Sequence, residues 1–170
     1  MKILLNSKNM GDVLALGGKE WYNVICMFES DIYQEIVNSP KYQRLKKFRQ
    51  HGKYSVYEHS ISVCRACFKI AKRLHLKVDE NALIRGALLH DYFLYDWHDK
   101  DCPKHHFTKH PALAAKNAKR DFGLSAKEEK IILSHMFPAG LKVPSSKEAW
   151  ILTIADKYCT VKEFFGRKKK

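Results

Sequence analysis

The sequence predicts an all-α protein that folds as one helical-bundle domain. Apolar residues recur at helical spacing along nearly the whole chain. No segment of strand length alternates between apolar and polar residues, the pattern typical of a half-buried β-strand. With 170 residues, 45% of them hydrophobic, the chain can bury one core, and 8 Gly and 5 Pro are too few for a collagenous or low-complexity protein.

Three helices are expected before residue 52. Their apolar positions are Trp21, Val24, Ile25 and Phe28, then Tyr33, Ile36 and Val37, then Leu45 and Phe48. The third helix starts at Ser39-Pro40, because proline is favoured in a first helical turn, and it is expected to end near Gly52.

Capping boxes predict three later helix starts, at about residues 55, 125 and 145, because each has a Ser followed three residues later by a Glu. The boxes are Ser55 to Glu58, Ser125 to Glu128 and Ser145 to Glu148. Asp79 and the His110-Pro111 pair mark two further starts. Between about residues 92 and 109 the helical pattern breaks, and a loop of this length is expected to be functional.

Cysteine usage and the N-terminus both predict a cytoplasmic protein without a membrane span. The five cysteines are an odd number scattered through helical patterns, which favours reduced thiols over disulfides. Cys64 and Cys67 have C-x-x-C spacing but fall in mid-helix, where buried packing is expected. The apolar run Ile3 to Leu5 is too short for a signal peptide or a membrane span.

Four His and two Asp fall on the apolar faces of the expected helices, where an unpartnered polar group is costly. His90 and Asp91 end the stripe that Leu83 and Ala87 begin. His59 shares a face with Val63, Ala66 and Ile70, His135 follows Ile131 by four residues, and Asp156 is centred in an apolar run. His110 lies at the rim of the bundle, beside the loop.

Imidazole and carboxylate ligands suit divalent Mn, Fe, Mg, Co, Ni or Zn, and a carboxylate can bridge two ions. Six such ligands exceed one tetrahedral zinc site, so two divalent metal ions are the expected cofactors. Paired metals generate hydroxide from water at neutral pH and stabilise the attacking and leaving oxygens of a phosphate.

The order His59, His90-Asp91, His110, His135, Asp156 resembles the HD superfamily of metal-dependent phosphohydrolases, and in particular its small stand-alone bacterial members. Their signature is a His, an adjacent His-Asp pair, further His residues and a late Asp. The resemblance implies an HD-type helical bundle with its metal site in the core. Residues 1–52 would be N-terminal helices, 55–160 the metal-binding core, and 166–170 a disordered basic tail.

By this resemblance His59, His90, Asp91 and Asp156 hold one metal, while Asp91, as the bridging and catalytic residue, shares the second with His110 and His135. The branch that cleaves cyclic dinucleotides has Gly-Lys two residues after the pair. Here Tyr92 to Trp97 follows, which speaks against that substrate class. His98, His105 and His106 lie in the same loop as His110 and are alternatives to it as ligands.

The resulting hypothesis is an enzyme that hydrolyses a phosphate ester of a nucleotide or another phosphorylated small molecule through a metal-bound hydroxide. It leaves open a phosphodiesterase or a phosphomonoesterase. Lys104, Lys109 and Lys157 are candidates for holding the substrate phosphate. The aromatic residues Tyr92, Tyr95 and Trp97 are expected to pack, with a platform for a nucleobase as the alternative.

Two alternatives come from the charge and from the ligand types. The formal net charge is +13, and a nucleic-acid- or nucleotide-binding module with structural or absent metal would use it. The densest basic run, however, has the spacing of a solvated helix face; it comprises Arg44, Lys46, Lys47, Arg49 and Lys53. A di-iron oxygenase would use the same His and Asp ligands. His51, beside Gly52, is expected only to interact with a helix C-terminus.

Overall fold

The computed structural model describes residues 27–100 and 102–165, and this part of the chain is helical. Its helices are α3 (Asp31–Asn38), α4 (Pro40–Gln43), the 3-10 helix η1 (Arg44–Lys47), α5 (Val56–Arg73), α6 (Glu80–Leu89), α7 (His106–Phe122), α8 (Ala126–Ser134) and α9 (Lys147–Phe165). An isolated bridge between Arg49 and Ser55 is the one β-type pairing among these residues. The all-α prediction is confirmed. The expected helix with Trp21, Val24 and Ile25 and the basic tail lie outside the described residues.

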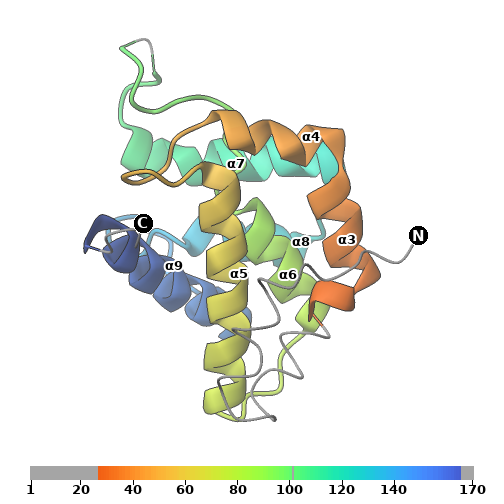
Figure 1. Ribbon diagram of the computed structural model, residues 1–170. Coiled ribbons are helices and arrows are strands. Elements are labelled where there is room, and N and C mark those ends of the chain that lie inside the picture. The colour runs from red at the N-terminus through yellow and green to blue at the C-terminus, as the bar shows by residue number, and fades with distance from the viewer. Residues whose placement is uncertain (1–26, 101, 166–170) are drawn as a thin grey trace.

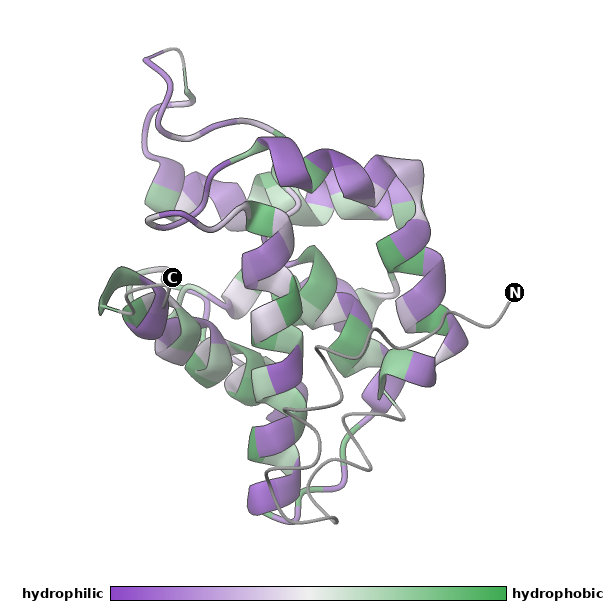
Figure 2. Cartoon of the chain, in the orientation of Figure 1, coloured by the Kyte–Doolittle hydropathy of each residue, from purple (hydrophilic) through white to green (hydrophobic). Residues whose placement is uncertain are grey.

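Helix α5 is the centre of the bundle (Figure 1). It packs most extensively against α9 and α6, while α8 contacts α6, α7 and α9. Hydrophobic side chains fill these contacts, and Val63, Cys67, Leu83 and Leu152 are fully buried. In Figure 2 each helix carries both hydrophobic and hydrophilic residues, as expected where one face packs inward.

Local capping chemistry explains several helix starts. Ser55 and Ser125 form complete capping boxes with Glu58 and Glu128, and the Asp79 side chain accepts the Ala82 N–H at 3.0 Å. Such caps contribute about 1 kcal/mol each. They fix where α5, α6 and α8 begin, as the sequence predicts.

Three predicted boundaries are wrong: the start of α9, the end of the helix after Pro40 and the start of α7. Helix α9 is capped by Ser146, whose Oγ accepts the Ala149 N–H at 3.2 Å, one residue later than the expected Ser145. Glu148 accepts instead from the Asp79 N–H, at 2.8 Å. The helix after Pro40 ends at Lys47 and not near Gly52, because Phe48 is already extended.

Helix α7 begins at His106, four residues before the predicted start. Pro111 therefore lies in its second turn, where it lacks the N–H for a helical hydrogen bond. His105 precedes the helix in the left-handed conformation (φ 64°) and makes no side-chain cap, so no sequence signal marks this start. The loop expected to run to about residue 109 ends at His105.

Residues 48–55 form a short closed turn between η1 and α5. The Val56 N–H donates to the Phe48 carbonyl at 2.9 Å, and the Gln50 N–H donates to the Tyr54 carbonyl at 2.8 Å. Gly52 supplies the positive φ (57°) that the turn requires. Gln50 is buried within the turn and Arg49 is exposed, so the turn presents one polar amide to the interior.

Candidate metal centre

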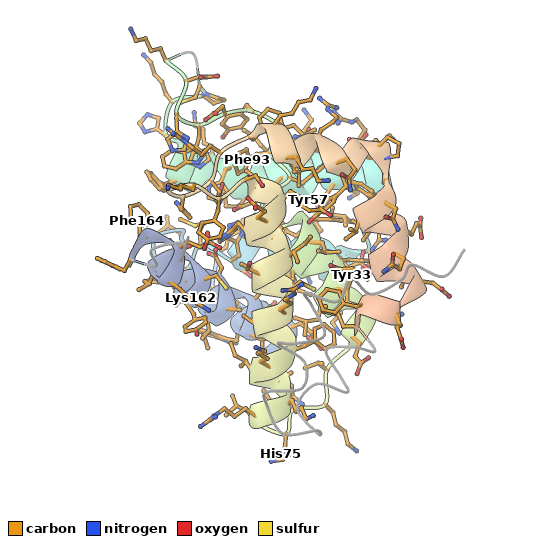
Figure 3. The ribbon with its side chains drawn as sticks, in the orientation of Figure 1. Tyr33, Tyr57, His75, Phe93, Lys162 and Phe164 are labelled. Atoms are coloured by element: carbon orange, nitrogen blue, oxygen red, sulfur yellow. The ribbon has the colours of Figure 1, made fainter. Side chains whose placement is uncertain are left out.

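The ends of four helices, α5 to α8, meet beside the middle of α9 at one place in the bundle. His59 is in the first turn of α5 and His110 in the second turn of α7. His90 and His135 directly follow the last residues of α6 and α8. Asp156 lies in α9 and Asp91 follows His90, and all six side chains are buried. Figure 3 labels His75 just beyond the C-terminal end of α5, the opposite end of this helix from the first turn that carries His59.

Gly86 allows the helices that carry two of these histidines to approach closely. A Cβ at this position would lie 2.6 Å from Cγ2 of Ile131, which is too close for an unshifted neighbour. The absence of that atom lets α6 pack onto α8. The imidazole rings of His90 and His135, at the ends of these helices, then lie with their centroids 5.0 Å apart.

The two carboxylate oxygens of Asp91 face different pairs of histidines. Oδ1 lies 3.2 Å from Nε2 of His110 and 3.5 Å from Nε2 of His135. Oδ2 lies 3.3 Å from Nε2 of His90 and 3.9 Å from Nε2 of His59. A carboxylate in this position can ligate on both sides.

Asp156 closes the cluster on the His59 side. Its Oδ1 lies 3.1 Å from Nε2 of His59 and 3.7 Å from Nε2 of His90. The Thr160 hydroxyl, one turn later in α9, donates to the same oxygen at 3.5 Å. The His59 side of the cluster therefore holds two carboxylates against two imidazoles.

All four imidazoles are oriented by a hydrogen bond at Nδ1. His90, His110 and His135 pair with the backbone carbonyls of Ala87, His106 and Ile132 at 2.8, 3.0 and 2.7 Å. Nδ1 of His59 pairs with the carboxylate of Glu163 at 2.9 Å. A carbonyl or carboxylate only accepts, so each Nδ1 carries a hydrogen, and each ring in its neutral form turns an Nε2 lone pair inward.

The donor set fits a metal. Four Nε2 atoms and two carboxylates face one another, and Nε2 of His110 lies only 2.9 Å from Nε2 of His135. Nε2 of His90 and Oδ1 of Asp91 are buried without a hydrogen-bond partner among the described residues. Groups that all accept require protons or cations between them, and imidazole with carboxylate is a common set for divalent metals.

Three groups of ligand atoms lie close enough together to hold an ion. They are His59, His90 and Asp91; His90, His135 and Asp156; and Asp91, His110 and His135. The third group coincides with the second site expected from the sequence, and the first is part of the other expected site. The structure thus brings all six predicted residues together; their role as metal ligands stays a prediction.

The electrostatics of the cluster differ between its two sides. Burial lowers the pKa of His59, but hydrogen bonds to Asp156 and Glu163 outweigh burial and raise this pKa to about 9. Burial likewise raises the pKa of Asp156, yet the hydrogen bond from His59 and the charge of the nearby His90 imidazole hold it well below its usual value. Burial and the neighbouring His110 and His90 lower the pKa of His135 to about 3.

The other loop histidines are engaged elsewhere. Nδ1 of His98 lies 2.9 Å from the Asp96 carboxylate, and the Tyr95 hydroxyl lies 2.8 Å from Nδ1 of His106. His105 is exposed. Burial and the nearby His110 lower the pKa of His106 to about 4. Of the four candidates, His110 is therefore the one that the structure places in the cluster.

A cavity of about 210 Å³ opens beside Asp91 and Asp156. Lys157 lines it, and the Lys157 ammonium donates to the His135 carbonyl at 3.1 Å. Lys104 and Lys109 are exposed and are not among the residues that line the cavity. Of the three lysines predicted to hold phosphate, Lys157 is the one that borders this cavity.

The aromatic residues after the His-Asp pair mainly pack. Tyr92 is fully buried, and its hydroxyl donates to Asp121 at 3.1 Å. Tyr95 is engaged with His106. Trp97 lines the cavity, but its ring contacts His98, with centroids 3.9 Å apart, and stacks on His106 at 5.2 Å. This arrangement favours packing over a platform for a nucleobase.

Three residues at the site were not predicted from the sequence: Gln50, His51 and Glu163. Gln50 Nε2 donates to Oδ2 of Asp91 at 2.5 Å, and His51 lines the cavity instead of only serving a helix terminus. Glu163 follows Asp156 by seven residues, so it lies on the same face of α9. That spacing is a signal that could have revealed Glu163; nothing in the sequence marks Gln50.

The comparisons with known proteins agree with this geometry. A family model described as "HD domain" matches residues 56–160. No curated protein and no solved structure gave a match. No helix in the described part of the chain has the length and apolar character that crossing a membrane requires.

Proposed function

Since the chain belongs to the HD-domain family, we propose that it is a metal-dependent phosphohydrolase acting on a phosphorylated small molecule or nucleotide. One observation carries the proposal: four imidazole Nε2 atoms and two carboxylates converge beside a cavity that a lysine borders. Such a set binds divalent cations, and cations together with a lysine attract phosphate.

The residues of the site would hold the metal ions and the substrate phosphate in the following way. His59, His90 and Asp156 would hold one ion, His110 and His135 a second, and Asp91 both, because its two oxygens face different histidine pairs. When bound, the metals supply Lewis acidity and lower the pKa of water. Gln50 holds the Asp91 carboxylate in place, and Lys157 would neutralise charge on the phosphate.

Metal dependence is the first test. Protein stripped with a chelator is reloaded with Mn, Fe, Co, Ni, Zn or Mg and assayed for phosphate release from a panel of phosphomonoesters and phosphodiesters. We expect release with at least one ion, up to two ions bound per chain, and loss of both properties in Asp91→Asn. Asp99→Asn, in an exposed loop, is the matched control and should behave like the wild type.

The same experiment separates the alternatives. If the protein binds no ion and releases no phosphate with any ion tested, the result contradicts the proposal. Oxygen consumption with iron, without phosphate release, would support the oxygenase instead.

A nucleic-acid-binding role has one observation in its favour. A broad depression of about 580 Å³ lies over η1 and the start of α5, and Lys46, Lys47, Arg49 and Lys53 border it. A polyanion held there would bind with an affinity that falls steeply with salt. Binding of this kind that survives Asp91→Asn, in protein without hydrolase activity, would favour that role.

A further inference from the structure

Two chemically different groups of residues line the cavity. One group belongs to the candidate metal centre, with Asp91, Asp156 and His110. The second group comprises Gln50 and His51, from the turn before α5, and Trp97, from the loop before α7. The second group lies in segments that the metal centre does not use. It therefore needs its own explanation.

Each residue of this second group has one buried polar atom without a hydrogen-bond partner among the described residues. The atoms are Oε1 of Gln50, Nδ1 of His51 and Nε1 of Trp97. Gln50 is only 6% exposed. Buried polar groups are nearly always paired in native proteins, so three unpaired groups around one cavity point to a ligand that pairs with them.

The hydrogen-bonding types of these atoms restrict the ligand. Gln50 donates through Nε2 to Asp91, which leaves Oε1 as an acceptor. The indole N–H of Trp97 can only donate, and Nδ1 of His51 does either, depending on its tautomer. A phosphate offers acceptors alone and cannot satisfy Gln50. A hydroxyl group donates and accepts, so hydroxyls can satisfy all three.

The size of the cavity and the ring contacts of Trp97 restrict the choice of ligand further. The volume of about 210 Å³ is below the roughly 300–1,000 Å³ of pockets for drug-sized ligands, which suits a phosphate with a short leaving group. The Trp97 ring already contacts His98 and His106. What Trp97 offers a ligand is therefore its N–H edge and not a stacking face, which disfavours a nucleobase.

We propose that Gln50, His51 and Trp97 form a subsite for the hydroxyl-bearing leaving group of a small phosphomonoester, such as a phosphorylated polyol or sugar. This inference rests on the proposed function. In the reaction, a water oxygen forms a bond to phosphorus, and the bond between phosphorus and the alcohol oxygen breaks. The leaving oxygen takes up a proton, so the products are inorganic phosphate and the polyol.

The test compares two substrates of nearly equal size, glycerol 3-phosphate and propyl phosphate, with the metal-loaded full-length protein. The second lacks the two hydroxyls of the first. We expect kcat/KM to be at least about tenfold higher for glycerol 3-phosphate, because unpaired buried groups penalise the analogue that lacks them. Trp97→Phe, which removes the indole N–H, should lower this ratio about 2- to 10-fold, and His51→Phe should lower it similarly.

The control is Trp150→Phe, since Trp150 lies in α9 outside the cavity lining; it should leave the ratio unchanged. Hydrolysis of both substrates with equal kcat/KM would overturn the subsite while leaving the phosphohydrolase in place. So would a ratio that Trp97→Phe and His51→Phe do not alter, or a higher kcat/KM for nucleoside monophosphates. Absence of phosphate release from every ester would contradict the proposed function and the subsite together.

Discussion

The carboxylate of Glu163 lies 2.9 Å from Nδ1 of His59, seven residues beyond Asp156 on the same helix. Glu163 thus keeps a hydrogen on Nδ1 of His59, and Oδ1 of Asp156 lies 3.1 Å from Nε2 of the same ring. The imidazole of His59 therefore lies between two carboxylates of α9. A carboxylate behind a ligand histidine orients the ring and raises its basicity.

Replacing Glu163 should therefore weaken metal binding without removing a metal ligand. For Glu163→Gln we expect metal affinity to fall about 10- to 100-fold, because the amide keeps an acceptor but loses the negative charge. Titration against a chromophoric chelator measures the change. Glu148→Gln is the matched control: it is a second buried glutamate of α9, but it bonds to Asp79 and not to the cluster. Equal affinities in wild type and Glu163→Gln would contradict this role.

Gly86→Ala should destabilise the protein even though alanine is the better helix former. The added Cβ would meet Cγ2 of Ile131 at 2.6 Å, and overpacking of this kind costs about 1–3 kcal/mol, against about 1 kcal/mol gained in helix propensity. Urea denaturation measures the net loss. In Ile131→Ala the colliding atom is absent, so Gly86→Ala should cost less there. Additive effects of the two substitutions would contradict the steric explanation.

Lys157 should matter most among the three candidate phosphate-binding lysines, because it alone borders the cavity while Lys104 and Lys109 are exposed. We expect Lys157→Met to lower kcat/KM about 10- to 100-fold, the range for a lost hydrogen bond to a charged group. Lys104→Met and Lys109→Met serve as matched controls with changes of less than about twofold. A larger loss in either control variant would indicate that the substrate phosphate binds near Lys104 or Lys109 and not near Lys157.

Asp121 should make stability depend on acid pH. Hydrogen bonds from Arg120 and Tyr92 lower the pKa of Asp121 to about 2. Because the unfolded value is higher, ionised Asp121 stabilises the native state above about pH 4, and this contribution is lost as the pH falls toward 2. The difference in urea midpoint between wild type and Asp121→Asn should therefore shrink between pH 5 and pH 3. A constant difference would contradict the assignment.

The sequence was informative wherever local chemistry acts within a few residues. Ser55, Asp79 and Ser125 cap their helices as predicted, because a cap needs only a side chain three residues away. It was less informative for α7, since His105 ends the loop by its backbone conformation and not by a side-chain cap. Pro111 is more visible in a sequence than His105, and it suggested a start four residues too late.

Long-range contacts explain what was missed at the site. Five of the six buried His and Asp stood out because each falls on an apolar face, and His110 stood out because Pro111 follows it. Gln50 did not, because the loop before α5 shows no periodicity, and only the folded turn carries its amide to Asp91. His51 likewise lines the cavity only because the fold brings Trp97, from the loop before α7, to the same place.

Gln50 and Glu163 also show that residues supporting the candidate metal centre lie beyond the part of the chain that matches the family model. The match ends at residue 160 and begins at residue 56, yet Gln50 and Glu163 lie outside it on either side. Both touch a residue of the candidate centre directly. A protein trimmed to the matched residues would keep six inward-facing side chains and lose the groups that hold Asp91 and His59 in position. Individual properties of this protein can therefore depend on segments that flank the family match.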